Sequence, residues 1–349
     1  MGVLYKNFVK PLMFRLDPEK AHEVAVDALS LLSQMPFLPR LMASFNQLGN
    51  NSVPVEICGI DFPNRVGLAA GFDKNAVCWP AFEALGFGHV EIGTVTLLAQ
   101  PGNPKPRMFR YPEHQAILNR MGFNNDGAEA VAQRLSRTLS RMDRRIPLGV
   151  NIGKSKAAPL DEAVEDYKGS FQLLADFADY VVINVSSPNT PDLRKLQEET
   201  RLRELLSTLV SLNLERDQQP GQSRKPIFLK VAPDLSLEQL DAIIATLLEL
   251  DLDGIIATNT TMAREGPFEN IDEPGGISGK PVDAMSTEII AHIAKTTAGN
   301  LPIIGVGGIT DPDSAKRKID AGASLVQIYS GMIFEGPFFG KRIAKTLVQ

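Results

Sequence analysis

The sequence predicts a parallel (β/α)8 barrel, the TIM barrel, with a small N-terminal helical extension, and three observations support this fold class. Past about residue 60, eight short runs of β-forming residues alternate with longer segments of helical periodicity. Polar or glycine-rich residues follow every run, as expected where function lies at the carboxyl ends of barrel strands. The GxGxxG turn of a doubly wound dinucleotide-binding sheet is missing.

The expected strands are short and apolar, and each lies ahead of a segment with turn residues. They are residues 65–70, 89–94, 147–152, 180–185, 226–231, 254–258, 302–306 and 325–329. The clearest helical segments are residues 126–141, 160–178, 236–250, 284–298 and 311–321. Asp234 or Ser236 is a suitable cap for the third of these helices, and Asp311 with Pro312 starts the last one.

The first 50 residues have a different pattern, and we expect a helical unit over 1–50 and a barrel over 51–349. Asp17 and Pro18 predict a helix start, and apolar residues follow on one face at helical spacing. The stretch 35–45 is apolar and broken by prolines. Two interpretations remain open: a helical hairpin packed on the barrel, or an interfacial patch or apolar tunnel.

Composition excludes several classes of protein. The 349 residues are 44% hydrophobic and 22% charged, which is typical of a soluble globular chain. A net charge of -5 argues against nucleic-acid binding. Two cysteines and four scattered histidines predict neither disulfides nor a metal site, and a reducing compartment is the default. No apolar run is long enough to span a bilayer, and no signal-peptide layout is present.

Two glycine-rich turns follow the seventh and eighth expected strands. They are Gly305 to Gly308 and Tyr329 to Gly331. Barrels commonly bind phosphate there, because glycine lets backbone N–H groups approach an anion. The stretch 274–281 is superficially similar to a P-loop, but its spacing is one residue short and Pro281 stands where a hydroxyl is needed. We therefore expect a phosphate site at the two turns and reject a P-loop at 274–281.

Lysines, amides and hydroxyls accumulate at the other strand ends. Lys74 and Lys230 lie where a cation is costly unless it meets an anion. Five asparagines lie on expected rim segments: Asn119, Asn151, Asn184, Asn189 and Asn259. Any one amide could cap a turn, but together they fit a pocket for a polar, planar ligand. With phosphate turns and no metal site, this set indicates a phosphorylated organic cofactor.

The ordered motifs resemble the dihydroorotate dehydrogenases of pyrimidine biosynthesis from about residue 10 to the C-terminus. They are GLAAGFDKN, EIGTVT, NRMGFNN, NIGKSK, NVSSPNTPDLR, KVAPDL, ATNTT, GGISGKP, PIIGVGGI and LVQIYSG. The resemblance implies FMN as cofactor and oxidation of dihydroorotate to orotate. Ser187 stands where class 1 members have cysteine, and this serine with the N-terminal extension is typical of the quinone-reducing class 2. One departure is Asp192, where the family usually has glycine.

By this resemblance, Ser187 is the base that removes a proton from substrate C5, and we add the hypothesis that Thr190 relays it. The implied substrate contacts are Lys74, Asn119, Arg120, Met121, Gly122, Phe123, Asn184, Asn189, Asn259 and Thr260. The implied FMN contacts are Ala70, Gly71, Phe72, Asp73, Lys74, Thr94, Asn151, Asn184, Lys230, Thr258, Gly279, Gly308, Tyr329 and Ser330. Lys230 is expected near the flavin N1 and O2 edge, where reduction leaves negative charge.

The resemblance also implies a quinone tunnel between the N-terminal helices, with His22 and Arg110 in its wall. We expect a monomeric peripheral membrane protein on the cytoplasmic face of the bacterial inner membrane, held mainly by apolar contacts. Two other functions agree less well with these residues. A class 1-like or other FMN barrel that uses fumarate or NAD is disfavoured by Ser187 and the extension. A phosphate-ligand-binding barrel without enzymatic activity leaves Ser187, Lys74 and Lys230 without a role.

Overall fold

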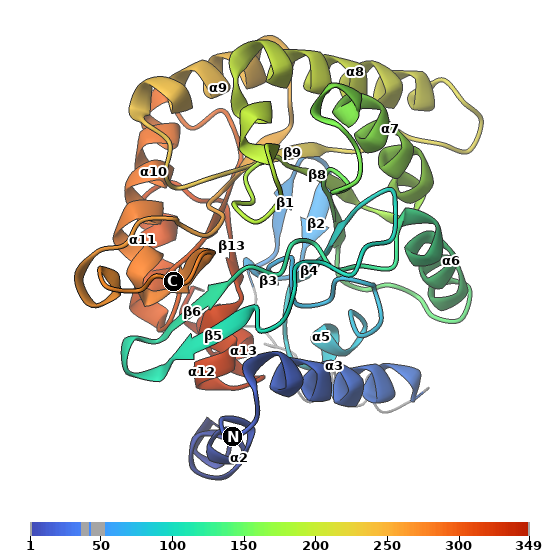
Figure 1. The fold of residues 1–349 in the computed structure, drawn as a ribbon. Helices are drawn as coiled ribbons and strands as arrows, with labels where there is room; N and C mark the ends of the chain where they lie inside the picture. Colours follow the sequence, from blue (N-terminus) through green and yellow to red (C-terminus); the bar gives the residue numbers. More distant parts are fainter. Residues whose placement is uncertain (1, 36–41, 43–52, 348–349) are drawn as a thin grey trace.

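The computed structural model describes residues 2–35, 42 and 53–347, and its central element is a closed barrel of eight parallel strands (Figure 1). The strands are β3 (Val66–Leu68), β4 (His89–Val95), β7 (Leu148–Ile152), β8 (Tyr180–Asn184), β9 (Ile227–Val231), β10 (Gly254–Ala257), β12 (Ile303–Val306) and β13 (Leu325–Ile328). They follow one another around the barrel in chain order, and β13 pairs with β3 to close it. All eight expected strands, and the fold class, are confirmed.

Helices surround the barrel, as Figure 1 shows. They are α5 (Ala81–Ala84), α6 (Ala128–Leu139), α7 (Ala163–Leu174), α8 (Glu199–Asp217), α9 (Leu237–Glu249), α10 (Asp283–Thr296), α11 (Pro312–Asp320), α12 (Ser330–Glu335) and α13 (Phe339–Thr346). Ser236 caps α9 with a reciprocal capping box to Gln239, and Asp311 caps α11 with Pro312 at its first position. The expected helix starts are confirmed, with Ser236 rather than Asp234 as the cap.

Two small sheets close the two ends of the barrel. The hairpin of β1 (Val55–Ile57) and β2 (Ile60–Phe62) places Ile57 and Phe62 against the apolar residues inside the barrel. A three-stranded antiparallel sheet of β5 (Met108–Tyr111), β6 (Ala116–Asn119) and β11 (Gly276–Gly279) lies at the other end. An isolated bridge from Thr261 to Ile277 joins this sheet to the segment after β10. The second sheet therefore borders the carboxyl ends of the barrel strands.

The N-terminal extension is helical, as expected. Its elements are α1 (Gly2–Leu4), a π-helix (Tyr5–Val9), α2 (Lys10–Met13) and α3 (Pro18–Gln34). Asp17 caps α3 by accepting hydrogen bonds from the N–H groups of Glu19 and Lys20. In Figure 1 these helices lie at one edge of the barrel, next to α5, α12 and α13. Across the described ranges, no helix combines the length and apolarity needed to cross a membrane. The expected boundary at residues 50 and 51, and most of the stretch 35–45, lie outside the described residues.

A buried ion pair joins α3 to the segment that leads into β5 of the small sheet. Arg107 donates to Glu19 at 2.7 Å, and both side chains are only 7% exposed. Burial raises the pKa of Glu19, but the hydrogen bonds and charges of Arg107 and Lys105 outweigh it and hold that pKa below its usual value. Because the pKa of Glu19 is lower in the folded than in the unfolded protein, its ionisation stabilises the fold at pH values above the unfolded-state pKa, near 4.3. This stabilisation is lost as the pH falls through the lower, folded-state pKa.

Replacing Glu19 by alanine is expected to lower the free energy of unfolding by about 3–5 kcal/mol, because Arg107 then remains buried without its partner. The loss should be largest at neutral pH and should shrink in acid. Urea denaturation of the two proteins at pH 7 and pH 4 measures it. Lys20→Ala is the matched control on the same helix, since its pair with Glu23 is exposed and contributes about 0–1 kcal/mol. Equal losses from both variants would contradict the anchoring role.

Candidate active site

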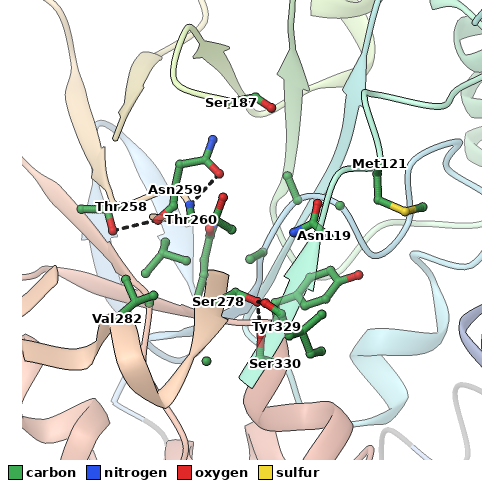
Figure 2. Close-up of a pocket in the computed structure, with 18 of the residues that line it drawn as sticks. Asn119, Met121, Ser187, Thr258, Asn259, Thr260, Ser278, Val282, Tyr329 and Ser330 are labelled. Carbon is green, nitrogen blue, oxygen red and sulfur yellow. Dashed lines mark hydrogen bonds between the residues drawn. The ribbon is translucent and has the colours of Figure 1, made fainter. Parts of the chain in front are cut away.

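A polar pocket lies at the carboxyl ends of the barrel strands, with an empty volume of about 1130 Å³ including its open side. Figure 2 shows Ser187 and Asn259 at one end of this active-site pocket and Ser278 and Ser330 at the other. The predicted residues that line it are Ala70, Gly71, Lys74, Thr94, Asn119, Met121, Gly122, Phe123, Asn184, Ser187, Asn189, Lys230, Thr258, Asn259, Thr260, Gly279, Gly308, Tyr329 and Ser330. Residues at or just after the carboxyl ends of seven of the eight barrel strands line the pocket, and β7 is the exception.

Four predicted residues lie elsewhere. Phe72 faces a second, apolar cavity, and Asp73 is buried and accepts hydrogen bonds from the N–H groups of Val77 and Cys78. Arg120 pairs with Glu273 and lines a neighbouring groove, which shares Ser187 and Asn189 with the pocket. Asn151 is fully buried and does not line the pocket, but its amide bonds to the lining residues Thr94 and Asn184.

Sequence reasoning missed other lining residues, among them Met108, Ile117, Ser278, Val282, Gly307 and Gln327. Met108, Ile117 and Ser278 come from β5, β6 and β11, the sheet that the sequence pattern did not predict. Gln327 could have been predicted from the sequence, because it is the only amide in an otherwise apolar strand, and buried polar side chains are uncommon.

The pocket floor is a connected set of amides and hydroxyls. Thr94 Oγ1 donates to Asn151 Oδ1 at 2.5 Å, and Asn184 Nδ2 donates to Thr94 Oγ1 at 2.9 Å. Asn259 Nδ2 donates to Asn184 Oδ1 at 3.3 Å and to Ser186 Oγ at 3.0 Å. Each amide is thereby held in one orientation, which fits recognition of a planar ligand with several donors and acceptors.

Two lysines border the same pocket. Lys74 Nζ donates to the Gly71 carbonyl at 2.7 Å, and burial lowers the pKa of Lys74 to about 8. Lys230, from β9, approaches Glu91 at 3.4 Å and is only 6% exposed. A pocket with two lysines and no carboxylate among its lining residues favours an anionic ligand.

The loop after β8 carries Ser187 and is held by neighbouring segments. Ser187 Oγ accepts a hydrogen bond from the Asn189 N–H at 3.3 Å, and Asn189 Nδ2 donates to the Asn119 carbonyl at 3.1 Å. Thr190 Oγ1 is buried and finds no hydrogen-bond partner among the residues that the structure covers. Asp192 has φ +58°, in the left-handed region that the family's usual glycine adopts without strain. Asp192 therefore adopts a left-handed backbone conformation that aspartate tolerates better than most residues but less freely than glycine.

Two glycines line the pocket where any side chain would collide with neighbouring backbone: Gly308 in the first glycine-rich turn and Gly279 in the segment 274–281. A Cβ at Gly308 (φ +75°) would lie 2.2 Å from Asp283 Cα, and one at Gly279 (φ +91°) would lie 2.1 Å from the Gln115 carbonyl oxygen. The hydroxyls of Ser278 and Ser330 meet beside them at 2.9 Å. Glycine backbone and paired hydroxyls are a suitable donor set for a phosphate, so these residues fit the phosphate end of FMN. Among the described residues, no cluster of three or more His, Cys, Asp or Glu side chains could bind a metal.

A second cavity, lined mainly by apolar side chains, lies under the N-terminal helices and has an empty volume of about 1550 Å³ including its open side. We call it the apolar cavity; α3 supplies seven of its lining residues. Met108 and Ile117 line both this cavity and the active-site pocket, so the two spaces are adjacent.

His22 and Arg110 both line the apolar cavity. The His22 ring lies edge-on to Phe72 at 4.9 Å, and burial together with the charge of Lys74 lowers the pKa of His22 to about 3. Arg110 lies over the Phe14 ring at 4.5 Å and donates to the carbonyls of Met13, Phe14 and Leu16. At neutral pH the wall therefore presents a neutral imidazole and the Arg110 guanidinium bonded to main-chain carbonyls, together with the ion pair of Arg342 and Glu335.

Comparisons with known proteins agree with this geometry. The dihydroorotate dehydrogenase family model matches residues 52–349. The "Dihydroorotate dehydrogenase (quinone)" of Gloeobacter violaceus is 49% identical over 99% of this chain and 94% of its own length, and that of Chloroflexus aurantiacus is 45% identical over 99% and 97%. A crystal structure of the Eimeria tenella DHODH in complex with ferulenol superposes with a TM-score of 0.84 at 37% identity, covering 96% of this chain and 93% of the other. The chain belongs to the dihydroorotate dehydrogenase family.

Proposed function

We propose that this protein oxidises (S)-dihydroorotate to orotate in pyrimidine biosynthesis, with FMN as its flavin and a membrane quinone as electron acceptor. The observation that carries the proposal is the adjacency of two unlike cavities. One holds Ser187, two lysines and the amide network; the other is apolar and lies under the N-terminal helices. A soluble acceptor such as fumarate or NAD has no need of the second cavity.

In the proposed reaction, Ser187 takes the proton from C5 of the substrate. FMN, when bound, supplies the two-electron acceptor for the hydride from C6. The amides of Asn119, Asn184, Asn189 and Asn259, together with Thr260, hold the pyrimidine ring and its carboxylate so that C5 faces Ser187. Lys74 offsets negative charge beside the substrate, and Lys230 does so beside the flavin's N1 and O2 edge.

The proton must leave Ser187, because a serine hydroxyl is a weak base unless a neighbour accepts its proton. Thr190 is three residues along the same loop, and its buried hydroxyl has no partner within the described ranges. It lines a groove that also contains Ser187, and there it would pass the proton on to water. Replacing Thr190 by valine, which keeps the shape, is expected to lower the rate of flavin reduction about tenfold or more. Anaerobic stopped-flow absorbance measures that rate. An unchanged rate would remove Thr190 from the relay.

The N-terminal unit 1–50 is proposed to attach the protein to the membrane that holds the quinone, on its cytoplasmic face, and to admit quinone past His22 and Arg110. Exposed apolar side chains on the first helices support this: Val3, Leu4, Phe8, Leu12 and Leu31 are each more than half exposed. We propose a monomer.

An anaerobic two-step assay tests the function as a whole. Dihydroorotate added to the purified yellow protein should bleach the flavin absorption, and a short-chain quinone should then restore it. Bleaching without recovery would preserve the chemistry in the active-site pocket but overturn the proposed acceptor. A colourless protein that binds no FMN would overturn the proposal.

A further inference from the structure

Glu91 is a carboxylate buried inside the barrel, below the active-site pocket. It lies on β4, and its side chain has no exposed surface. A buried carboxylate is costly unless charges and hydrogen bonds compensate it. Three donors from three other strands do so: Gln327 Nε2 on β13 at 2.8 Å, Asn151 Nδ2 on β7 at 2.8 Å, and Lys230 Nζ on β9 at 3.4 Å. Glu91 therefore joins four strands of the barrel from the inside.

Lys230 connects this carboxylate to the pocket, because its side chain also lines the pocket wall. The 3.4 Å separation from Glu91 Oε1 is longer than the 2.7–2.9 Å typical of a charge-assisted hydrogen bond. An ammonium has three N–H donors, and the contact with Glu91 occupies one of them loosely. The charge of Lys230 is thus shared between Glu91 below and whatever negative charge develops in the pocket.

Glu91 also determines the direction of the amide network. A carboxylate only accepts hydrogen bonds, so Asn151 must turn its NH2 group toward Glu91. Asn151 Oδ1 then accepts from the Thr94 hydroxyl and from Asn184 Nδ2. Asn184 Oδ1 in turn accepts from Asn259 Nδ2. Turning the Asn151 side-chain amide by 180° would place its carbonyl oxygen against the carboxylate. Only one order of donors and acceptors along the network is therefore favourable.

We infer that Glu91 is a positioning residue that sets how strongly Lys230 stabilises negative charge in the pocket, and thereby the reduction potential of the flavin. This inference rests on the proposed function, since it assumes FMN in the active-site pocket. With Glu91 ionised, the positive charge of Lys230 is partly compensated before any electron arrives. Removing the carboxylate charge leaves that positive charge to act on the reduced, electron-rich flavin edge. A purely structural ion pair would change stability without changing this potential.

The test is the midpoint potential of the flavin in the full-length holoenzyme, with Glu91→Gln as the main variant. We expect the ratio of affinities for reduced and oxidised FMN to rise about tenfold, which is about 30 mV for a two-electron couple. Glu91→Asp, which keeps the charge, should stay near the wild-type potential. Lys230→Met should lower the potential. The double variant Lys230→Met/Glu91→Gln should have the same potential as Lys230→Met alone. An unchanged or lowered potential in Glu91→Gln alone would overturn the inference.

Gln327→Met offers a second measurement if Glu91→Gln does not retain flavin. It removes one donor from the carboxylate, leaving more of the negative charge to compensate Lys230, so the potential should fall. A potential equal to wild type in a folded Gln327→Met holoenzyme would overturn the inference as well.

The wild-type protein separates this inference from the function on which it rests. A wild type that is yellow and bleaches with dihydroorotate, combined with variants whose potentials do not move, rejects the role of Glu91 alone. A wild type that binds no FMN rejects the proposed function.

Discussion

Replacing Ser187 by alanine is expected to slow the reduction of the flavin by dihydroorotate about a thousandfold, the middle of the range for loss of a general base. Ser187 lines the active-site pocket, and its hydroxyl is held by the Asn189 N–H. Alanine keeps the loop but removes the atom that we propose accepts the C5 proton. The amides proposed to orient the ring are untouched, so substrate affinity should change little. Anaerobic stopped-flow bleaching over a range of dihydroorotate concentrations separates rate from affinity.

The control for this substitution is Ser170→Ala. Ser170 is fully buried, lies on α7 away from the pocket, and its hydroxyl has no hydrogen-bond partner in the part of the chain that the structure describes. It should bleach like the wild type. In Ser187→Ala, reoxidation of chemically reduced flavin by quinone should remain normal, because the apolar cavity is intact. Wild-type bleaching in Ser187→Ala would contradict the assignment of the base.

The barrel was predictable because buried parallel strands are nearly continuous apolar runs. Residues 180–184 are an example, and all of them are buried. The sheet of β5, β6 and β11 was not predictable in the same way. Its strands have four residues each and mix apolar with polar residues or glycine, and β6 pairs with β11 across more than 150 residues of chain. A short strand whose partner is so distant has no local signal strong enough to identify it.

The candidate site was predictable as a set of segments but not as a set of side-chain directions. In the segment after β3, Gly71 and Lys74 face the active-site pocket, Phe72 faces the apolar cavity, and Asp73 turns inward to cap backbone N–H groups. A motif identifies such a segment, but the turn that follows the strand decides where each side chain points. Glu91 was overlooked for a related reason, since sequence alone does not show that a strand carboxylate faces the barrel interior.

Blocking the apolar cavity is expected to slow electron transfer from the flavin to quinone. Replacing Ala25 by tryptophan should lower the rate of flavin reoxidation by quinone about a hundredfold, because misplacing a reactant by a small distance is enough for such a loss. Ala25 lines the apolar cavity on α3 and is partly buried, so an indole there occupies the space proposed for quinone.

Leu31→Trp is the matched control for this blocked cavity. Leu31 lies on the same helix, is 59% exposed and does not line the apolar cavity. Both variants should bleach with dihydroorotate at the wild-type rate, because the active-site pocket is unchanged, and only Ala25→Trp should recover slowly when quinone is added. Equal recovery in the two variants would show that electrons leave by another route. Slow bleaching in Ala25→Trp would instead mean that α3 supports the active-site pocket, through the Met108 and Ile117 wall that the two cavities share.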